Sequence, residues 1–91
     1  MLQLNFPAYH FRIKNSENKT LIFDVIRKKY VVLQPEEWVR QHTLMYLIKT
    51  KQYPKSHVNV EKHIKLHGIV KRYDLVAYNR HGSIKILIEF K

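Results

Sequence analysis

The chain has 91 residues, 45% hydrophobic and 12% aromatic, so it is expected to fold as one small domain and not to be disordered. Seventeen Lys and Arg against seven Asp and Glu give a formal net charge of +10, which favours a polyanionic partner, nucleic acid before an anionic membrane surface. It has no cysteine, which excludes disulfides and thiolate metal sites. It also lacks a signal-peptide pattern and the ~18-residue apolar run of a membrane span, which predicts a cytoplasmic protein and not a membrane one.

The N-terminal third predicts small β elements. Residues 9–14 alternate weakly, residues 15–19 read as a polar turn, and residues 20–24 are apolar again, which is typical of a hairpin. Residues 30–33 form a β-branched stretch, which predicts a third short strand or a buried connection. We therefore assign residues 1–33 to a β extension.

The central segment, residues 34–53, predicts the main helix. Pro35 suits the first turn, and Glu36 and Glu37 complement the positive end of the helix dipole. No breaker follows until Pro54, and apolar residues are spread around much of the helix. We therefore expect this helix to be packed on more than one side.

The last segment, residues 56–91, predicts a three-stranded antiparallel meander. Glycine and asparagine separate its strands, which are expected over His57–Lys65, Arg72–Tyr78 and Ser83–Lys91. Small β elements, one helix and a meander together make an α+β fold. We expect residues 1–91 to form a single domain.

Two acids on neighbouring apolar strands form the most informative pattern of the chain. Asp74 is followed, after fourteen intervening residues, by Glu89, and Lys91 comes two positions later. Such acids can hold Mg²⁺, which prefers oxygen ligands and keeps several waters, while a lysine can orient or deprotonate an attacking water. The spacing alone is loose, and a cross-strand ion pair is the competing interpretation.

The turn at Asn79–Gly82 decides whether the two acids meet. Opposed residues of an antiparallel pair point to one face, so Asp74 and Glu89 share a face only if the numbers of opposed residues sum to an odd value. A two-residue turn gives 163 and places them directly opposite, whereas a four-residue loop gives 161 and makes them diagonal neighbours. A three-residue loop with a glycine bulge gives 162 and separates them, unless a further bulge restores the pairing.

Four blocks of the sequence resemble a known family. Phe23–Val31, Pro35–Gln41, Arg72–Asp74 and Ile88–Lys91 follow the order and spacing of the type I restriction enzyme R-protein N-terminal domain family, within the PD-(D/E)XK nuclease superfamily. The resemblance implies a Mg²⁺-dependent DNA endonuclease of a restriction system, built on part of a restriction-endonuclease-like core. Its partners would be DNA and the motor, specificity and modification subunits of a restriction complex.

The resemblance also implies roles for individual residues. Asp74 and Glu89 would be the metal ligands, Lys91 the catalytic lysine, and Glu37 or Glu36 an accessory acid, although acids in a first turn more often serve the helix dipole. The superfamily core continues with another helix and strand after the lysine, and this sequence ends there. We therefore expect the family chemistry, but not activity of this chain alone.

The remaining charged residues have weaker assignments. We expect Glu61 to be a charge on the exposed face of its strand and not a third site acid. Basic side chains are candidate contacts for DNA phosphates, although such pairs are often solvated surface. They are Arg27, Lys28, Lys29, Lys71 and Arg72.

Two other functions stay open on the sequence. One is a basic DNA-binding module without catalysis, and the other is an oligomerisation piece. A chain that ends on an apolar strand can leave an unpaired sheet edge, so we also expect a homo-oligomer.

Overall fold

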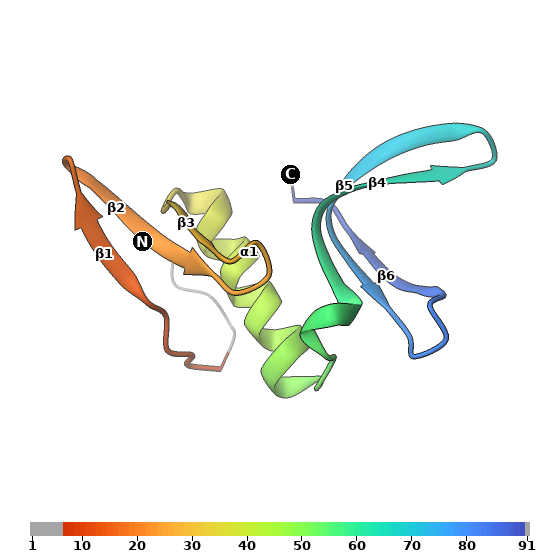
Figure 1. Ribbon diagram of the computed structural model, residues 1–91, viewed down its shortest axis with the longest axis horizontal. Helices are drawn as coiled ribbons and strands as arrows, with labels where there is room; N and C mark the ends of the chain where they lie inside the picture. Colours follow the sequence, from red (N-terminus) through yellow and green to blue (C-terminus); the bar gives the residue numbers. More distant parts are fainter. Residues whose placement is uncertain (1–6, 91) are drawn as a thin grey trace.

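The computed structural model describes residues 7–90, which form two three-stranded antiparallel sheets and one α-helix (Figure 1). The α+β class expected from the sequence is therefore confirmed. The first sheet has the strand order β1-β2-β3 and consists of Ile13–Ser16, Lys19–Asp24 and Lys29–Val32.

The β1–β2 hairpin turns more tightly than the polar run of residues 15–19 suggests. Ser16 pairs with Lys19, so only Glu17 and Asn18 form the turn. Both have positive φ angles, 50° and 64°, which suit a two-residue hairpin because they match the strand twist.

The helix α1 spans Pro35–Met45 and continues as a π-helical turn over Tyr46–Thr50. Its start agrees with the prediction, with proline in the first turn and two acids beside it. It ends before the expected residue 53, because Gln52 takes a left-handed conformation with φ of 61°, and the Tyr53 N–H donates to the Leu47 carbonyl at 2.9 Å.

The second sheet is the predicted meander, with the order β4-β5-β6. Its strands are Val58–Leu66, Ile69–Tyr78 and Ile84–Ile88. The far end of the β4–β5 hairpin projects from the body of the molecule, at the upper right of Figure 1.

The apolar core lies between the helical segment and the second sheet. Its buried members are each at most 3% exposed: Leu44, Leu47, Val58, Leu75 and Ala77. Fully burying a side chain of the larger kinds contributes about 1.5–3 kcal/mol. The core therefore fixes β5, which carries Asp74, against the helix that carries Glu37.

The turn between β5 and β6 is the three-residue loop with glycine, and a second irregularity corrects its register. Gly82 has φ of 84°, and Tyr78 pairs with Ile84, which gives the even sum of 162. A bulge between Ala77 and Tyr78 then shifts the pairing, so that Leu75 opposes Ile88 and the sum becomes 163. The pairing ends at Leu75 and Ile88, and the sum of 163 is the one that direct opposition of Asp74 and Glu89 requires.

The side chain of Asn79 organises this turn. Its Oδ1 accepts hydrogen bonds from the backbone N–H groups of His81 at 2.9 Å and Ser83 at 3.0 Å. Replacing Asn79 with alanine is expected to destabilise the fold by about 1 kcal/mol, because two N–H groups of the turn lose their protein acceptor and must hydrogen-bond to water instead. Urea denaturation measures the loss. Asn15→Ala is the control, since that side chain accepts from the exposed Thr20 hydroxyl, and an equal loss in both variants would contradict the role of Asn79.

Candidate functional site

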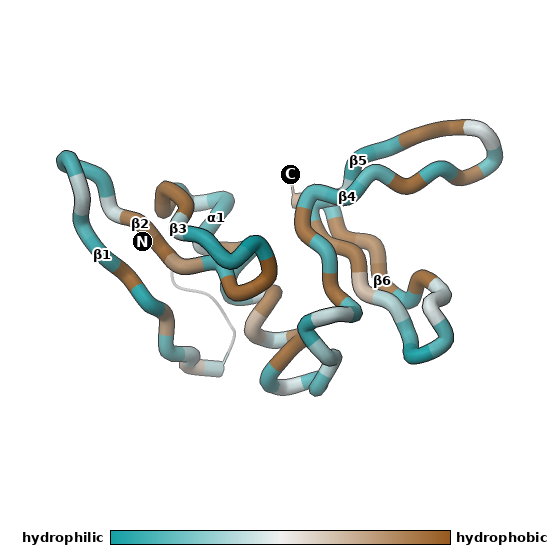
Figure 2. Tube along the Cα trace, in the orientation of Figure 1, coloured by the Kyte–Doolittle hydropathy of each residue, from teal (hydrophilic) through white to brown (hydrophobic). Residues whose placement is uncertain are grey.

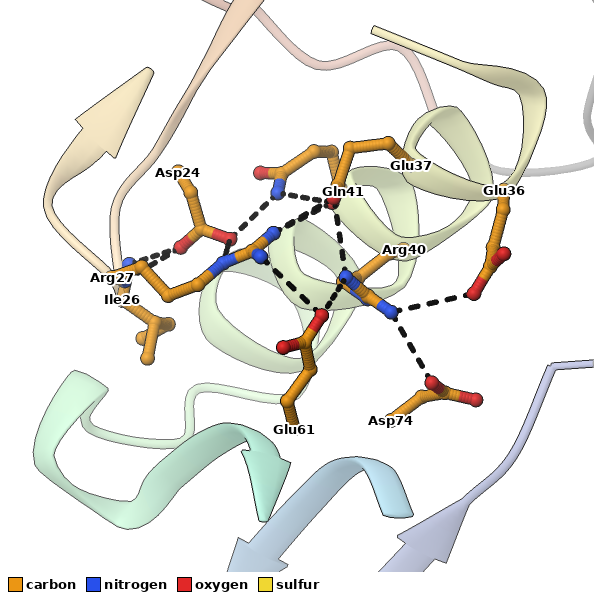
Figure 3. Close-up of polar contacts among 9 residues, drawn as sticks. All are labelled: Asp24, Ile26, Arg27, Glu36, Glu37, Arg40, Gln41, Glu61 and Asp74. Carbon is orange, nitrogen blue, oxygen red and sulfur yellow. Dashed lines mark hydrogen bonds and ion pairs between the residues drawn. The ribbon is translucent and has the colours of Figure 1, made fainter. Parts of the chain in front are cut away.

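Most of the acidic residues gather where β2, the helix and the second sheet approach one another (Figure 3). Five of the seven acids of the chain lie there, together with two arginines and a glutamine. We call these residues the carboxylate cluster: Asp24, Glu36, Glu37, Glu61, Asp74, Arg27, Arg40 and Gln41. In a chain of charge +10, such a concentration of carboxylates marks the candidate site.

Asp24, at the end of β2, is fully buried and has both oxygens engaged. Its Oδ1 accepts from the backbone N–H groups of Ile26 and Arg27 at 2.8 and 2.7 Å. Its Oδ2 accepts from Nε of Arg27 and from the Gln41 amide, each at 2.8 Å. Burial acts to raise the pKa of Asp24, but these hydrogen bonds and the charge of Arg27 outweigh it and hold the pKa below the ordinary 3.8.

Glu37 lies between the two arginines of the carboxylate cluster. Its oxygens accept from Nη2 of Arg27 at 2.8 and 2.9 Å and from Nη1 of Arg40 at 3.1 Å. Burial acts to lower the pKa of Arg27, but its hydrogen bonds to Glu37 and Asp24 raise it above the ordinary value. The side chain of Glu37 is 11% exposed and that of Glu36 61%, so of the two candidate accessory acids Glu37 is the inner one.

Arg40 connects the helix to the second sheet. Its side chain is 5% exposed, and its guanidinium lies 3.1 Å from Glu37, 3.2 Å from Glu61 and 3.2 Å from Asp74. Its Nε has no hydrogen-bond partner among residues 7–90. Arg40 therefore provides one positive charge that contacts acids of both the helix and the second sheet.

Asp74, in β5, and Glu89, one residue beyond β6, have different partners. The Oδ1 of Asp74 lies 3.2 Å from Nη2 of Arg40, and its Oδ2 accepts from the Phe90 N–H at 2.7 Å. Glu89 instead accepts a hydrogen bond from Lys71 at 2.6 Å, which raises the pKa of that lysine. The structure thus brings Asp74 into the carboxylate cluster and leaves Glu89 outside it.

The available ligands suit Mg²⁺ in kind, because carboxylate oxygens are the donors that this ion prefers. Within the described range 7–90, no group of three His, Asp or Glu side chains could hold one ion together. Mg²⁺ often takes one or two carboxylates and completes its shell with water, and in this structure Asp74 and Glu89 are each paired with a basic side chain. Lys91, the expected catalytic lysine, lies outside the described residues.

Glu61 is exposed, as the sequence predicts, but it also lies in the carboxylate cluster. Its side chain is 41% exposed and lies 3.2 Å from Nη1 of Arg40 and 3.6 Å from Nη1 of Arg27. Its backbone is left-handed, with φ of 53°, in the middle of β4. Such conformations cost about 1–3 kcal/mol in residues other than glycine and gather at functional sites. The signal that the sequence offered is that Glu61 is the single acid between residues 58 and 73.

The five candidate DNA contacts have different surroundings. Arg27 and Lys71 form ion pairs with carboxylates, and all of the five except Arg27 are exposed. Arg72 borders the carboxylate cluster, because it lines a cavity of about 270 Å³ together with Glu36, Glu37, Arg40 and Glu61.

Comparison with known proteins identifies a family for the larger part of the chain. The sequence model of the type I restriction enzyme R protein N terminus matches residues 35–91. This segment contains the helix and the second sheet, whereas the Phe23–Val31 block of the resemblance lies outside it. No curated protein and no solved structure matches the chain. None of the helices within residues 7–90 is long and apolar enough to cross a membrane.

Proposed function

The chain belongs to the type I restriction enzyme R protein N-terminal family, and on that premise we propose that it is a Mg²⁺-dependent DNA endonuclease domain of the PD-(D/E)XK type. The observation that supports this proposal is the β5–β6 register inside the family-matched segment, whose paired residues sum to 163, the value that direct opposition of Asp74 and Glu89 requires. Its partners in the proposal are DNA and the other subunits of a restriction complex.

In this proposal each residue has one task. Asp74 and Glu89 hold the ion, Glu37 is the accessory acid, and Lys91 orients the attacking water. The ion, when bound, polarises the phosphate and lowers the pKa of a bound water. The Phe90 N–H fixes one oxygen of Asp74, so that the other faces the cluster.

Cation binding in this proposal requires an exchange of partners. Arg40 has to release Oδ1 of Asp74, and Lys71 has to release Glu89. The contact of Arg40 is buried and that of Lys71 is largely exposed, so the release of Asp74 is the more costly step.

Calorimetric titration of the 91-residue chain with Mg²⁺ tests the ligand assignment. Asp74→Asn is expected to weaken Mg²⁺ binding by at least about tenfold, equivalent to about 1.4 kcal/mol, and Glu89→Gln by a similar factor. Glu17→Gln is the matched control, since this acid lies in the β1–β2 turn and outside the cluster. Equal affinities of the unmodified chain and Asp74→Asn would overturn the assignment.

A basic DNA-binding module without catalysis is the second candidate, and the present engagement of both Asp74 oxygens favours it. It differs from the nuclease in its response to substitution. Salt-sensitive DNA binding that survives Glu89→Ala, in a chain that shows no Mg²⁺ binding by calorimetry, would support the module. Cleavage that Lys91→Ala abolishes would support the enzyme.

A further inference from the structure

The outer part of the β4–β5 hairpin is a two-stranded ribbon. Its strands pair from His63 opposite Arg72 to Leu66 opposite Ile69. In the part of the chain that the structure describes, β6 pairs along β5 no further than Leu75. The ribbon therefore stands away from the core, as Figure 1 shows.

The ribbon carries positive charge and no acid of its own, although Lys71 pairs with Glu89, which lies beyond β6. Residues 62–73 contain four Lys or Arg, two His and no Asp or Glu. All but two of the twelve are exposed. A projecting basic ribbon suits a polyanion, because each phosphate that it neutralises releases a condensed counterion.

One face of the ribbon leads towards the carboxylate cluster. Opposed residues share a face, so His63 and Arg72 lie on the same face as Lys65. Arg72 precedes Asp74 by two residues along β5, so both point to one side of the strand, and Arg72 lines the cavity that borders the cluster. The basic side chains thus form a path that ends at the candidate site.

The tip of the ribbon is apolar and exposed. Leu66 is 44% exposed, Ile69 70% and Val70 59%. Figure 2 shows this hydrophobic stretch of β5 beside the turn, with a hydrophilic stretch nearer the body. Isolated exposed apolar residues are ordinary, but three around one turn suggest a contact surface. In the major groove, apolar side chains can contact the methyl group of thymine.

We propose that the β4–β5 hairpin is a DNA-contacting arm, in which His63, Lys65 and Arg72 follow the phosphate backbone towards the carboxylate cluster and the apolar tip enters a groove. A major groove about 12 Å wide admits a two-stranded β-ribbon. The inference takes DNA as the partner from the proposed function, but it does not require that the chain cleaves DNA. The absence of acids from residues 62–73 favours DNA over a protein partner.

Fluorescence anisotropy with a labelled 20-base-pair duplex in EDTA, over a series of salt concentrations, tests the arm. Lys65→Gln/Arg72→Gln is expected to reduce the slope of log affinity against log salt by roughly 2, because about 0.9 counterions are released for each phosphate contact. Lys19→Gln/Lys49→Gln, which removes the same charge from two exposed lysines outside the ribbon, is the matched control and should leave the slope nearly unchanged. Equal slopes in the two double variants would overturn the proposal.

A second variant separates the tip from the basic path. Ile69→Ser should fold, because this side chain is 70% exposed, and it is expected to weaken binding about tenfold with the salt slope unchanged. If light scattering instead finds a dimer that Ile69→Ser dissociates, with DNA binding unaffected, the tip is a contact between copies and the proposal fails. EDTA makes this assay independent of Mg²⁺. If Asp74→Asn binds Mg²⁺ as tightly as the unmodified chain while the salt slopes come out as expected, that result counts only against the nuclease.

Discussion

Arg40→Met is expected to destabilise the fold by about 3 kcal/mol, towards the lower end of the cost of leaving buried charges without their partner. Arg40 is 5% exposed and contacts Glu37, Glu61 and Asp74. Methionine keeps much of the apolar stem, so the loss reports mainly on the charge. The expected loss is a net value, because the substitution also removes the buried Nε that has no partner among the described residues, which by itself would stabilise the fold by about 1–3 kcal/mol. Urea denaturation at neutral pH measures the difference.

Two further measurements sharpen this experiment. Arg40→Lys keeps the charge but lacks the forked guanidinium, so an intermediate loss is expected. Under the proposed function, millimolar Mg²⁺ restores part of the stability of Arg40→Met, because a ligand that binds only the folded state stabilises it. Its effect on the unmodified chain is expected to be smaller, since there Arg40 competes for Asp74. Stability equal to that of the unmodified chain in both variants would show that Arg40 does not hold the fold together.

Asp24→Asn is expected to cost about 3 kcal/mol at neutral pH, because it breaks a buried ion pair. An amide offers one acceptor oxygen where the carboxylate offers two, so its NH₂ group would face the donors on Arg27 and Gln41 or the turn N–H groups. Thermal or urea unfolding measures the loss. Glu17→Gln is the control for removing an acid from an exposed turn, and a comparable loss there would contradict the role of Asp24.

The loss in Asp24→Asn should depend on pH in a defined direction. The pKa of Asp24 is lowered in the folded state, so its contribution is fully present above the unfolded-state pKa, near the ordinary 3.8. Below that value the unfolded chain takes up the proton first, and the contribution is lost as pH falls through the folded pKa. The stability gap between the two proteins should therefore narrow from about pH 4 downward. A constant gap over that range would contradict the ionised, hydrogen-bonded state of Asp24.

The fold could be predicted largely because its signals are local. Pro35 with two following acids identifies the start of the helix, and alternating apolar residues identify the meander. Turn length restricted the β5–β6 register to a few alternatives. The bulge between Ala77 and Tyr78, which decides among them, has no turn residue or glycine to mark it in the sequence.

The carboxylate cluster could be predicted only in part, because its contacts join distant residues. Arg40 and Asp74 are separated by 34 positions, and no pattern in the helix indicates that pairing. Arg27 reads as a DNA contact in a basic run, but its partners are Asp24 and Glu37. The roles of Asp74, Glu89 and Lys91 in catalysis stay predictions.

The carboxylate cluster also divides the charge of the molecule unevenly. Its five carboxylates and two guanidiniums leave a net charge of −3, so the rest of the +10 chain carries +13. Most of the surface then attracts a polyanion electrostatically, whereas the carboxylate cluster repels it. Both forces act over a range of about 10 Å at 0.1 M salt. Long-range electrostatic forces would therefore favour binding of a cation at the carboxylate cluster before a phosphate group approaches it.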